Sequence, residues 1–379
     1  MAGKDLDVTA RSCKVATKQS PIRQGISLDE IHRYNWRLLR RRMARNDMSK
    51  GDSMFRKLAL IMLGMALALS ACASPNSTNE AGELTRIRLP MGYIPNIQFA
   101  PFYVAIEKGY FQDAGIEIEF DYKFETDGVA LVGAGELPFA IASGEQVLLA
   151  RAQGLPIVYV AAWYQQYPVS VVAKSELGIL IPQDLKGRKI GLPGLFGANY
   201  VGLRALLHEA GLEESDVTLD AIGFNQVELM AAGQQDIIVG YAANEPIQLR
   251  AQGIPVTEIR VADYVQLASN GLLASEKAIA EEPELVRAFV GAFMKGLEDT
   301  IANPDESFAI SKSYIPNFAD LDADVQKQVL ETSIEQWKAE RLGYSDPQAW
   351  ENMQNVLLDM GLITEKMDLN KAFTNEFVP

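Results

Sequence analysis

Cysteine and histidine are almost missing from this chain. Its 379 residues include two cysteines, Cys13 and Cys72, and two histidines. The N-terminal features described below predict cleavage before Cys72, which leaves one cysteine and therefore no internal disulfide, zinc–thiolate site or free cysteine nucleophile. The body keeps one histidine, His208, in a helical segment away from the candidate loops. A Gly-x-Ser-x-Gly elbow and a P-loop are also absent. We therefore predict no catalytic residue, no metal ligand and no cofactor.

The chain also lacks an apolar run long enough to cross a membrane. Its longest, residues 58–69, has about a dozen residues, whereas a spanning helix needs about 20. The run follows a short basic segment and ends in Leu69-Ser70-Ala71-Cys72, so residues 54–71 have the order of a secretory signal peptide. Leu-Ser-Ala-Cys resembles the lipobox of bacterial lipoproteins, whose cysteine is acylated. We expect a lipid, with palmitate, on Cys72; a plain signal peptide that ends in cysteine is the alternative.

The segments on either side of the signal peptide have separate interpretations. Residues 72–85 are polar and poor in helix formers, which is typical of a tether between an anchor and a folded body. Residues 1–53 fit nothing downstream, and we favour a misplaced start, with translation from Met48 or Met54. An extended n-region, a twin-arginine signal or a nucleic-acid patch around Arg40–Arg42 are the alternatives.

Basic charge is scarce in the predicted mature protein. Of 35 basic and 49 acidic residues, 14 and 6 precede Cys72, which leaves 21 basic against 43 acidic residues. A body this acidic repels nucleic acid and anionic lipid. We predict no nucleic-acid partner, and attachment to the extracytoplasmic face of the cell membrane through the lipid alone.

From Arg86 onward, short β-branched segments alternate with helical segments that end at glycine. The strand Ile87–Met91 and the helix Pro101–Lys108, which stops at Gly109, begin the series. This order predicts α/β units on largely parallel sheets. We expect two lobes, with the chain crossing near Val171–Lys174 and Ala268–Ala274. Residues 86–172 and 273–379 would form the first lobe, and residues 174–268 the second.

Ligands of such sheets bind at the carboxyl ends of the strands, where loops lead into helices. These loops are rich in aromatic and amide side chains. Aromatic walls with a few polar groups suit a flat heterocycle better than a sugar phosphate or a metal ion; the alternative is that many of these rings belong to the core. The candidate ligand-binding residues are Tyr93, Asn96, Gln98, Asp127, Ser143, Glu145, Trp163, Tyr164 and Tyr167 in the first lobe, and Phe196, Asn199, Tyr200, Tyr241, Asn244 and Glu245 in the second.

Four segments resemble the thiamine-precursor/alkanesulfonate/taurine family of solute-binding proteins. They are Gly92–Asn96, Phe102–Phe111, Gly115–Glu117 and Ala150–Ile157, and the resemblance extends from about Arg86 to the end. It implies a two-lobed periplasmic-binding-protein fold of type II with two crossovers at the hinge. Such proteins close around a small molecule and deliver it to an ABC permease and its ATPase. We expect a monomer that is not an enzyme.

The resemblance also bears on the ligand. Gly144–Val147 is closest to the branch that binds thiamine pyrimidine precursors, but Phe99 stands where those relatives have histidine, and the loop Phe196–Tyr200 lacks their acidic residue. A site richer in rings would accept a larger flat vitamin, so we rank riboflavin first and a thiamine pyrimidine second. Sulfonates rank third because these loops contain no arginine. A pyrimidine-synthase-like enzyme and a lipoprotein sensor are the alternatives outside transport.

Overall fold

The computed structural model describes residues 84–379. The predicted signal peptide, the lipid on Cys72 and the tether up to residue 83 lie outside the described residues. Thr85, which we expected to end the tether, is the first residue of a strand. Within the described part of the chain, no helix combines the length and the apolar character that crossing a membrane requires.

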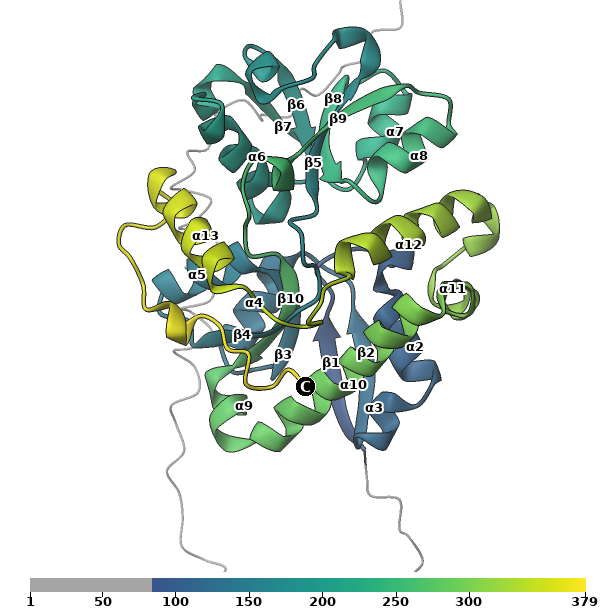
Figure 1. Cartoon of the computed structure of the whole chain (residues 1–379), viewed down its shortest axis with the longest axis vertical. Coiled ribbons are helices and arrows are strands. Elements are labelled where there is room, and N and C mark those ends of the chain that lie inside the picture. The colour runs from purple at the N-terminus through teal and green to yellow at the C-terminus, as the bar shows by residue number, and fades with distance from the viewer. Residues whose placement is uncertain (1–83) are drawn as a thin grey trace, which may run out of the picture. The chain divides into compact units, whose positions relative to one another are not determined.

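The first lobe contains five strands and most of the helices (Figure 1). Strands β1 (Thr85–Pro90) and β2 (Ile116–Asp121) pair in parallel, and β10 (Asn270–Ser275) lies antiparallel between β3 (Phe139–Ser143) and β4 (Ile157–Ala162). The helices of this lobe are α2 (Ala100–Glu107), α3 (Tyr110–Asp113), α4 (Glu125–Gly133), α5 (Gly144–Ala152), α9 (Glu276–Glu281), α10 (Pro283–Ala302), α11 (Pro304–Ser311), α12 (Ala323–Trp337) and α13 (Pro347–Asp359).

The second lobe is built on a five-stranded sheet. Its order is β7 (Thr218–Ala221), β6 (Lys189–Leu192), β8 (Ile237–Tyr241), β5 (Val169–Lys174) and β9 (Val256–Arg260). Helices α6 (Gly197–Glu209), α7 (Gln226–Ala231) and α8 (Glu245–Ala251) pack around it (Figure 1). The α/β class predicted from the sequence is thus present in both lobes.

The position of the first crossing was predicted wrongly. Residues 169–172, assigned to the first lobe, belong to β5, which pairs with β8 and β9 inside the second sheet. The chain therefore crosses in residues 163–168, and it returns before β10 begins at Asn270. The expectation of largely parallel sheets holds for β1 with β2, but β3-β10-β4 is antiparallel throughout and the second-lobe sheet combines both directions. The cause is the first strand after each crossing, β5 or β10, which runs antiparallel to both its neighbours.

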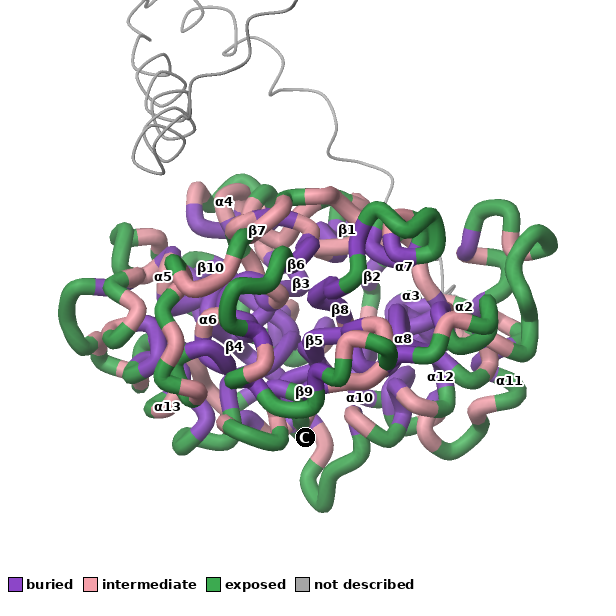
Figure 2. Tube along the Cα trace, turned by 90° about the horizontal axis from the view of Figure 1, so that it is seen from above, coloured by how far each residue is buried: buried purple, intermediate pink, exposed green. Residues whose placement is uncertain are grey.

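Helix α10 shows how the sequence pattern becomes packing. The apolar positions 286, 289, 290, 293, 294 and 297 form one face of the helix and are all buried, as their helical spacing predicts. Gly296 lies on the same helix against α2, where its missing side chain allows close approach. Buried residues concentrate on the strands and on the inward faces of such helices (Figure 2).

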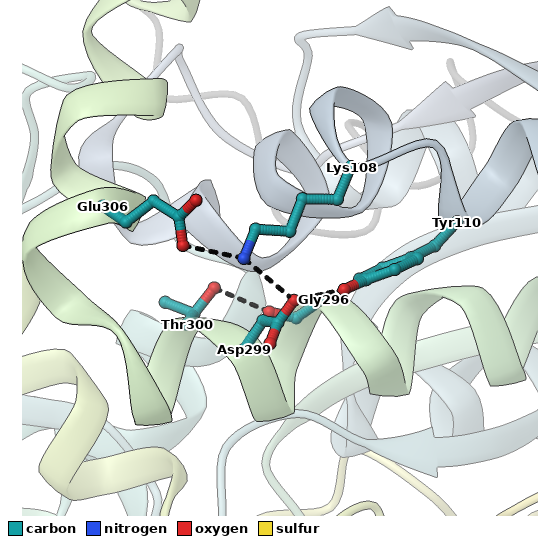
Figure 3. A network of polar contacts seen from close by, with 6 residues as sticks. All are labelled: Lys108, Tyr110, Gly296, Asp299, Thr300 and Glu306. Atoms are coloured by element: carbon teal, nitrogen blue, oxygen red, sulfur yellow. Dashed lines mark hydrogen bonds and ion pairs between the residues drawn. The ribbon is translucent and has the colours of Figure 1, made fainter.

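A polar network ties α10 to residues at the end of α2, in α3 and in α11 of the first lobe (Figure 3). Lys108 Nζ, after the end of α2, lies 3.2 Å from Asp299 Oδ2 and 2.7 Å from Glu306 Oε2. The Tyr110 hydroxyl donates to Asp299. Because Lys108 and its partners reach solvent, these pairs contribute little to stability individually, and we assign the network to structure rather than to binding.

Candidate functional site

A cleft lies between the two lobes, and its empty volume is about 800 Å³ with the solvent at its mouth included. The cleft is lined by residues of both lobes, most of them in loops that lead from a strand into a helix. The first lobe and its hinge segments contribute Met91, Gly92, Tyr93, Gln98, Phe99, Phe124, Glu125, Ile141, Trp163, Tyr164 and Asn270. The second lobe contributes Pro193, Phe196, Gly197, Ala198, Asn199, Phe224, Gln226, Tyr241, Asn244 and Glu245.

Buried aromatic rings form the inner wall of the cleft. Trp163 lies with its ring centre 5.7 Å from that of Phe99 and 5.0 Å from that of Tyr164. Tyr164 meets Tyr241 of the second lobe edge to face at 6.1 Å. Trp163 and Tyr164 also contact Trp337 of α12, which fixes their orientation from behind. These contacts hold the rings in place, and the ring faces that line the cleft can stack on a flat ligand.

A second group of rings joins the lobes at the rim. Phe124 of the first lobe contacts Phe196 and Phe224 of the second, at 5.3 and 4.9 Å between ring centres. Tyr93 meets Phe224 edge to face at 4.7 Å. Phe196 keeps 43% of its surface exposed, so the rings cover the cleft without forming a sealed core.

Polar side chains in the second-lobe part of the cleft are fixed by the loop between β8 and α8. Glu245, the first residue of α8, accepts hydrogen bonds from the Tyr241 backbone N–H at 2.7 Å and from Asn244 Nδ2 at 3.2 Å. Gly240 makes room for this carboxyl, because a methyl group there would lie 2.6 Å from Glu245 Oε2. Burial raises the pKa of the Glu245 carboxyl to about 7.

A carboxyl network extends from the cleft into the first lobe. Glu125, the first residue of α4, accepts a hydrogen bond from Asn270 Nδ2 at 3.0 Å, and Asn270 Oδ1 accepts one from the Tyr241 hydroxyl at 3.1 Å. The Ser143 hydroxyl lies between two carboxyls, 2.7 Å from Glu125 Oε2 and in contact with Glu145 Oε1. One hydroxyl proton cannot serve two carboxylates, so this arrangement favours a proton on one of them.

The pKa values of the Glu125 and Glu145 carboxyls are both raised above the ordinary value of a glutamate. Burial raises the pKa of the Glu125 carboxyl, and the neighbouring Glu145 raises it further. Burial likewise raises the pKa of Glu145, which receives hydrogen bonds from Ser143 and from the more distant Gln146. Among the described residues no basic nitrogen lies within 4.0 Å of Glu125, Glu145 or Glu245.

Two further residues of the cleft carry polar atoms without a partner in the described part of the chain. These are Nε1 of Trp163, a donor, and Oδ1 of Asn199, an acceptor, both buried. Buried polar atoms normally have a hydrogen-bond partner. The lining contains no lysine, arginine or histidine. The arrangement can therefore hold a flat, uncharged molecule that has both donors and acceptors.

Nine of the fifteen candidate binding residues line the cleft: Tyr93, Gln98, Trp163, Tyr164, Phe196, Asn199, Tyr241, Asn244 and Glu245. They come from both lobes, as the crossing topology requires for a site between them. Gln98 is also tied into the first lobe, where its Nε2 donates to the Tyr164 hydroxyl at 3.1 Å and to Ser333 Oγ at 3.2 Å.

The structure places the other six candidates outside the cleft lining: Asn96, Asp127, Ser143, Glu145, Tyr167 and Tyr200. The Asn96 side chain is used as a helix cap: its Oδ1 accepts a hydrogen bond from the Gln98 backbone N–H at 2.9 Å, at the start of the short 3₁₀ helix Ile97–Phe99. Asp127 is exposed because it lies two residues after Glu125 in α4, and two residues turn a helix by about 200°.

The remaining four are held by partners inside the lobes. Ser143 and Glu145 lie behind Glu125 in the carboxyl network. The Tyr167 hydroxyl donates to the Ala198 carbonyl at 3.0 Å, and the Tyr200 hydroxyl donates to Glu214 at 2.6 Å. Ser143, Glu145 and Tyr167 thus support lining residues without lining the cleft themselves.

Sequence reasoning missed several lining residues, notably Phe99, Phe124, Glu125, Phe224 and Asn270. Glu125 belongs to a loop that we had singled out, but the helix phase was needed to choose it over Asp127. Phe224 follows strand β7 and Asn270 begins strand β10, and their position depends on strand order. The segment Gly223-Phe224-Asn225 before α7 is of the same strand-to-helix type and could have been included.

Comparison with known proteins gives consistent matches. A family model described as NMT1/THI5 like matches residues 96–307. The riboflavin-binding protein RibY of Chloroflexus aurantiacus is 43% identical over 345 residues, which cover 85% of this chain and 98% of that protein. The formylaminopyrimidine-binding protein of Halalkalibacterium halodurans is 28% identical over 302 residues, covering 78% of this chain and 91% of that protein.

Among solved structures, the periplasmic aliphatic sulphonate binding protein SsuA from Escherichia coli aligns with a TM-score of 0.62. It is 14% identical and covers 76% of this chain and 92% of that chain. At this identity the likeness concerns the fold alone. It confirms the two-lobed periplasmic-binding-protein fold predicted from the sequence.

Proposed function

Because the chain belongs to the NMT1/THI5-like family, we propose that it is the solute-binding subunit of an ABC importer and that its solute is riboflavin. The observation that carries the proposal is a cleft between two lobes that has aromatic walls and no basic residue. The relative at 43% identity is named as a riboflavin-binding protein. This name agrees with the sequence prediction of a binding protein rather than an enzyme.

Riboflavin matches the cleft in shape and in chemistry. Its three fused rings are flat, and the wall around Trp163 and Tyr164 offers ring surface for stacking. The ring system has acceptors and an N–H donor, while its sugar-like chain has several hydroxyls. The carboxyls of Glu125 and Glu245 can accept hydrogen bonds from such hydroxyls. Binding then needs no charge on the ligand.

Closure of the lobes would link binding to delivery. Lining residues come from both lobes, so a ligand in the cleft contacts both and stabilises their closed arrangement. The ring contacts of Phe124 with Phe196 and Phe224 would form or break as the lobes move. We propose that the closed protein, as a monomer, presents its ligand to a membrane permease driven by an ATPase.

We further propose that the protein works at the extracytoplasmic face of the cell membrane, held there by acylation of Cys72. The support is the order of the sequence: a basic segment, an apolar run and Leu-Ser-Ala-Cys, followed by a polar tether that leads to the folded body. Such an anchor raises the effective concentration of the protein at its permease, because the tether keeps the protein near the membrane.

A pyrimidine precursor of thiamine is the second candidate, favoured by the relative that is named as a formylaminopyrimidine-binding protein. The absence of a basic residue from the lining argues against a sulfonate.

The test is a titration of the purified protein with riboflavin and with formylaminopyrimidine, followed by tryptophan and flavin fluorescence. Riboflavin should bind with quenching of the flavin. The variant Tyr241→Ala should lose about 1–3 kcal/mol of binding free energy if this ring stacks on the ligand. Tyr110→Ala removes a ring that is not part of the cleft lining and whose hydroxyl contacts Asp299, and it is the matched control (Figure 3). If only the pyrimidine binds, the proposed solute becomes a pyrimidine precursor instead of riboflavin. If neither compound binds, the result contradicts the proposal.

A further inference from the structure

The acidic groups of the cleft come from both lobes and face the region where a ligand would lie. Glu125 begins α4 of the first lobe and Glu245 begins α8 of the second. Both line the cleft. Their hydrogen-bond partners are amides and hydroxyls, namely Asn270 and Ser143 for Glu125, and Asn244 with a backbone N–H for Glu245. The cleft therefore has two carboxyls and no compensating cation in its lining.

The obvious place for an anion in this cleft is the beginning of α6. This helix has 13 residues, and its N-cap residue, Phe196, gives no side-chain hydrogen bond to the first turn. Free N–H groups at the start of a helix attract anions. A methyl group placed on Gly197, the first residue of α6, would lie 4.0 Å from Glu125 Oε2. The carboxyl of Glu125, supplied by the other lobe, thus already faces the start of α6.

A ligand with a phosphate group would be disfavoured in either protonation state of these carboxyls. If they are ionised, the phosphate is buried beside like charges in a region of low dielectric. If they are protonated, the phosphate is buried with no cation to compensate it. Phosphate sites usually supply arginine, lysine or free helix N–H groups; here the lining has no basic residue, and Glu125 faces the helix.

We infer that the cleft selects by charge: it accepts the uncharged vitamin and excludes the same vitamin carrying a phosphate ester, with Glu125 and Glu245 as the residues that determine this selectivity. The inference rests on the proposed function and names the form of the ligand that is taken up. It follows that vitamin already carrying a phosphate ester outside the cell would not be captured by this protein.

The experiment compares riboflavin with flavin mononucleotide, which has the same rings and sugar chain plus a phosphate. Both are titrated into the purified protein under identical conditions. We expect the dissociation constant of the phosphate ester to be higher by about 100-fold or more, since like charges brought together without compensation are strongly disfavoured. The ratio of the two constants is the readout, because it cancels losses of affinity that both flavins share.

Variants locate the source of the discrimination. At a pH above the raised pKa values of these two carboxyls, where both are ionised, Glu125→Gln and Glu245→Gln keep the shape of the side chain and remove its charge, and each should lower the ratio by about 10-fold. Glu176→Gln removes one charge from an exposed position of the second lobe and should leave the ratio unchanged. High salt separates local from long-range repulsion, because it screens the acidic surface but not a buried pair. The discrimination should therefore persist in high salt.

The outcomes are distinct. Riboflavin binding with an equally tight phosphate ester would overturn the inference and leave the proposed function standing. Discrimination that disappears in high salt, or that neither glutamine variant reduces, would assign it to the overall charge and overturn the role of the two glutamates. Failure of riboflavin to bind at all would remove the proposed function and the inference with it.

Discussion

Two glycines of helix α10 allow the packing of the first lobe to be tested with one chemical change. A methyl group at Gly296 would lie 2.2 Å from the Pro101 carbonyl oxygen and 2.7 Å from Ala105 Cβ, both in α2. A methyl group at Gly291, five residues earlier, would meet nothing within 4 Å. Alanine at these positions therefore has the same effect on helix propensity and opposite effects on packing.

The expected magnitudes follow from these distances. Gly291→Ala should raise the free energy of unfolding by up to about 1 kcal/mol, because alanine loses less conformational entropy in a helix than glycine. At Gly296 the same gain is exceeded by steric overlap with the backbone of α2. Overpacking of a close-packed core typically costs about 1–3 kcal/mol, and we expect a net destabilisation in that range.

Urea unfolding followed by tryptophan fluorescence measures this difference. The tryptophans among residues 84–379 are Trp163, Trp337 and Trp350, and all three are buried in the first lobe or at its boundary with the hinge. Their signal therefore reports the lobe that contains α10. The two alanine variants should differ by about 2–4 kcal/mol. If Gly296→Ala were as stable as Gly291→Ala, α2 and α10 could not approach as closely as the structure shows.

Two more predictions concern protonation and anchoring. Burial raises the pKa of the Glu245 carboxyl from 4.5 to about 7, so this carboxyl binds its proton more tightly in the folded protein than in the unfolded chain. The free energy of unfolding should then fall as pH rises from 4.5 to 7, by up to about 3 kcal/mol from this group; Glu245→Gln should flatten the urea-unfolding pH profile, and an unchanged slope would contradict the assignment. Cys72→Ser should move the protein from the membrane to the soluble fraction of producing cells, and membrane retention would exclude the lipid anchor.

The sequence predicted the elements of this fold better than their pairing. Val171–Lys174 was predicted as a crossing between the lobes, whereas Val169–Lys174 is strand β5, because a run of β-branched residues does not say which sheet it joins. That choice is made by β8 and β9, which pair with β5 from about 70 to 90 residues further along the chain. The error in the first crossing and the overestimate of parallel pairing have this common cause.

The same limit explains which site residues could be found. Loops next to a strand end were accessible from sequence, and Trp163, Asn199 and Tyr241, which were chosen in this way, lie in the cleft lining. The choice of Asp127 over Glu125 failed because it needs the rotation of α4 about its axis. Asn270 was missed because its place in the cleft depends on β10 crossing back between β3 and β4.

The acidity of the cleft and its lack of cations have one structural origin, the first turns of helices. Glu125 and Glu245 each begin a helix, where the helix dipole favours a carboxylate. Nearby N–H and hydroxyl groups supply further hydrogen bonds, so the carboxyls can be buried without a lysine or arginine. A binding site built this way offers acceptors to the donors of a neutral ligand. A cation added to recruit phosphorylated ligands would compete with the neutral ligand's donors for those acceptors, so affinity for the neutral vitamin and for its phosphate ester cannot both be maximal in this cleft.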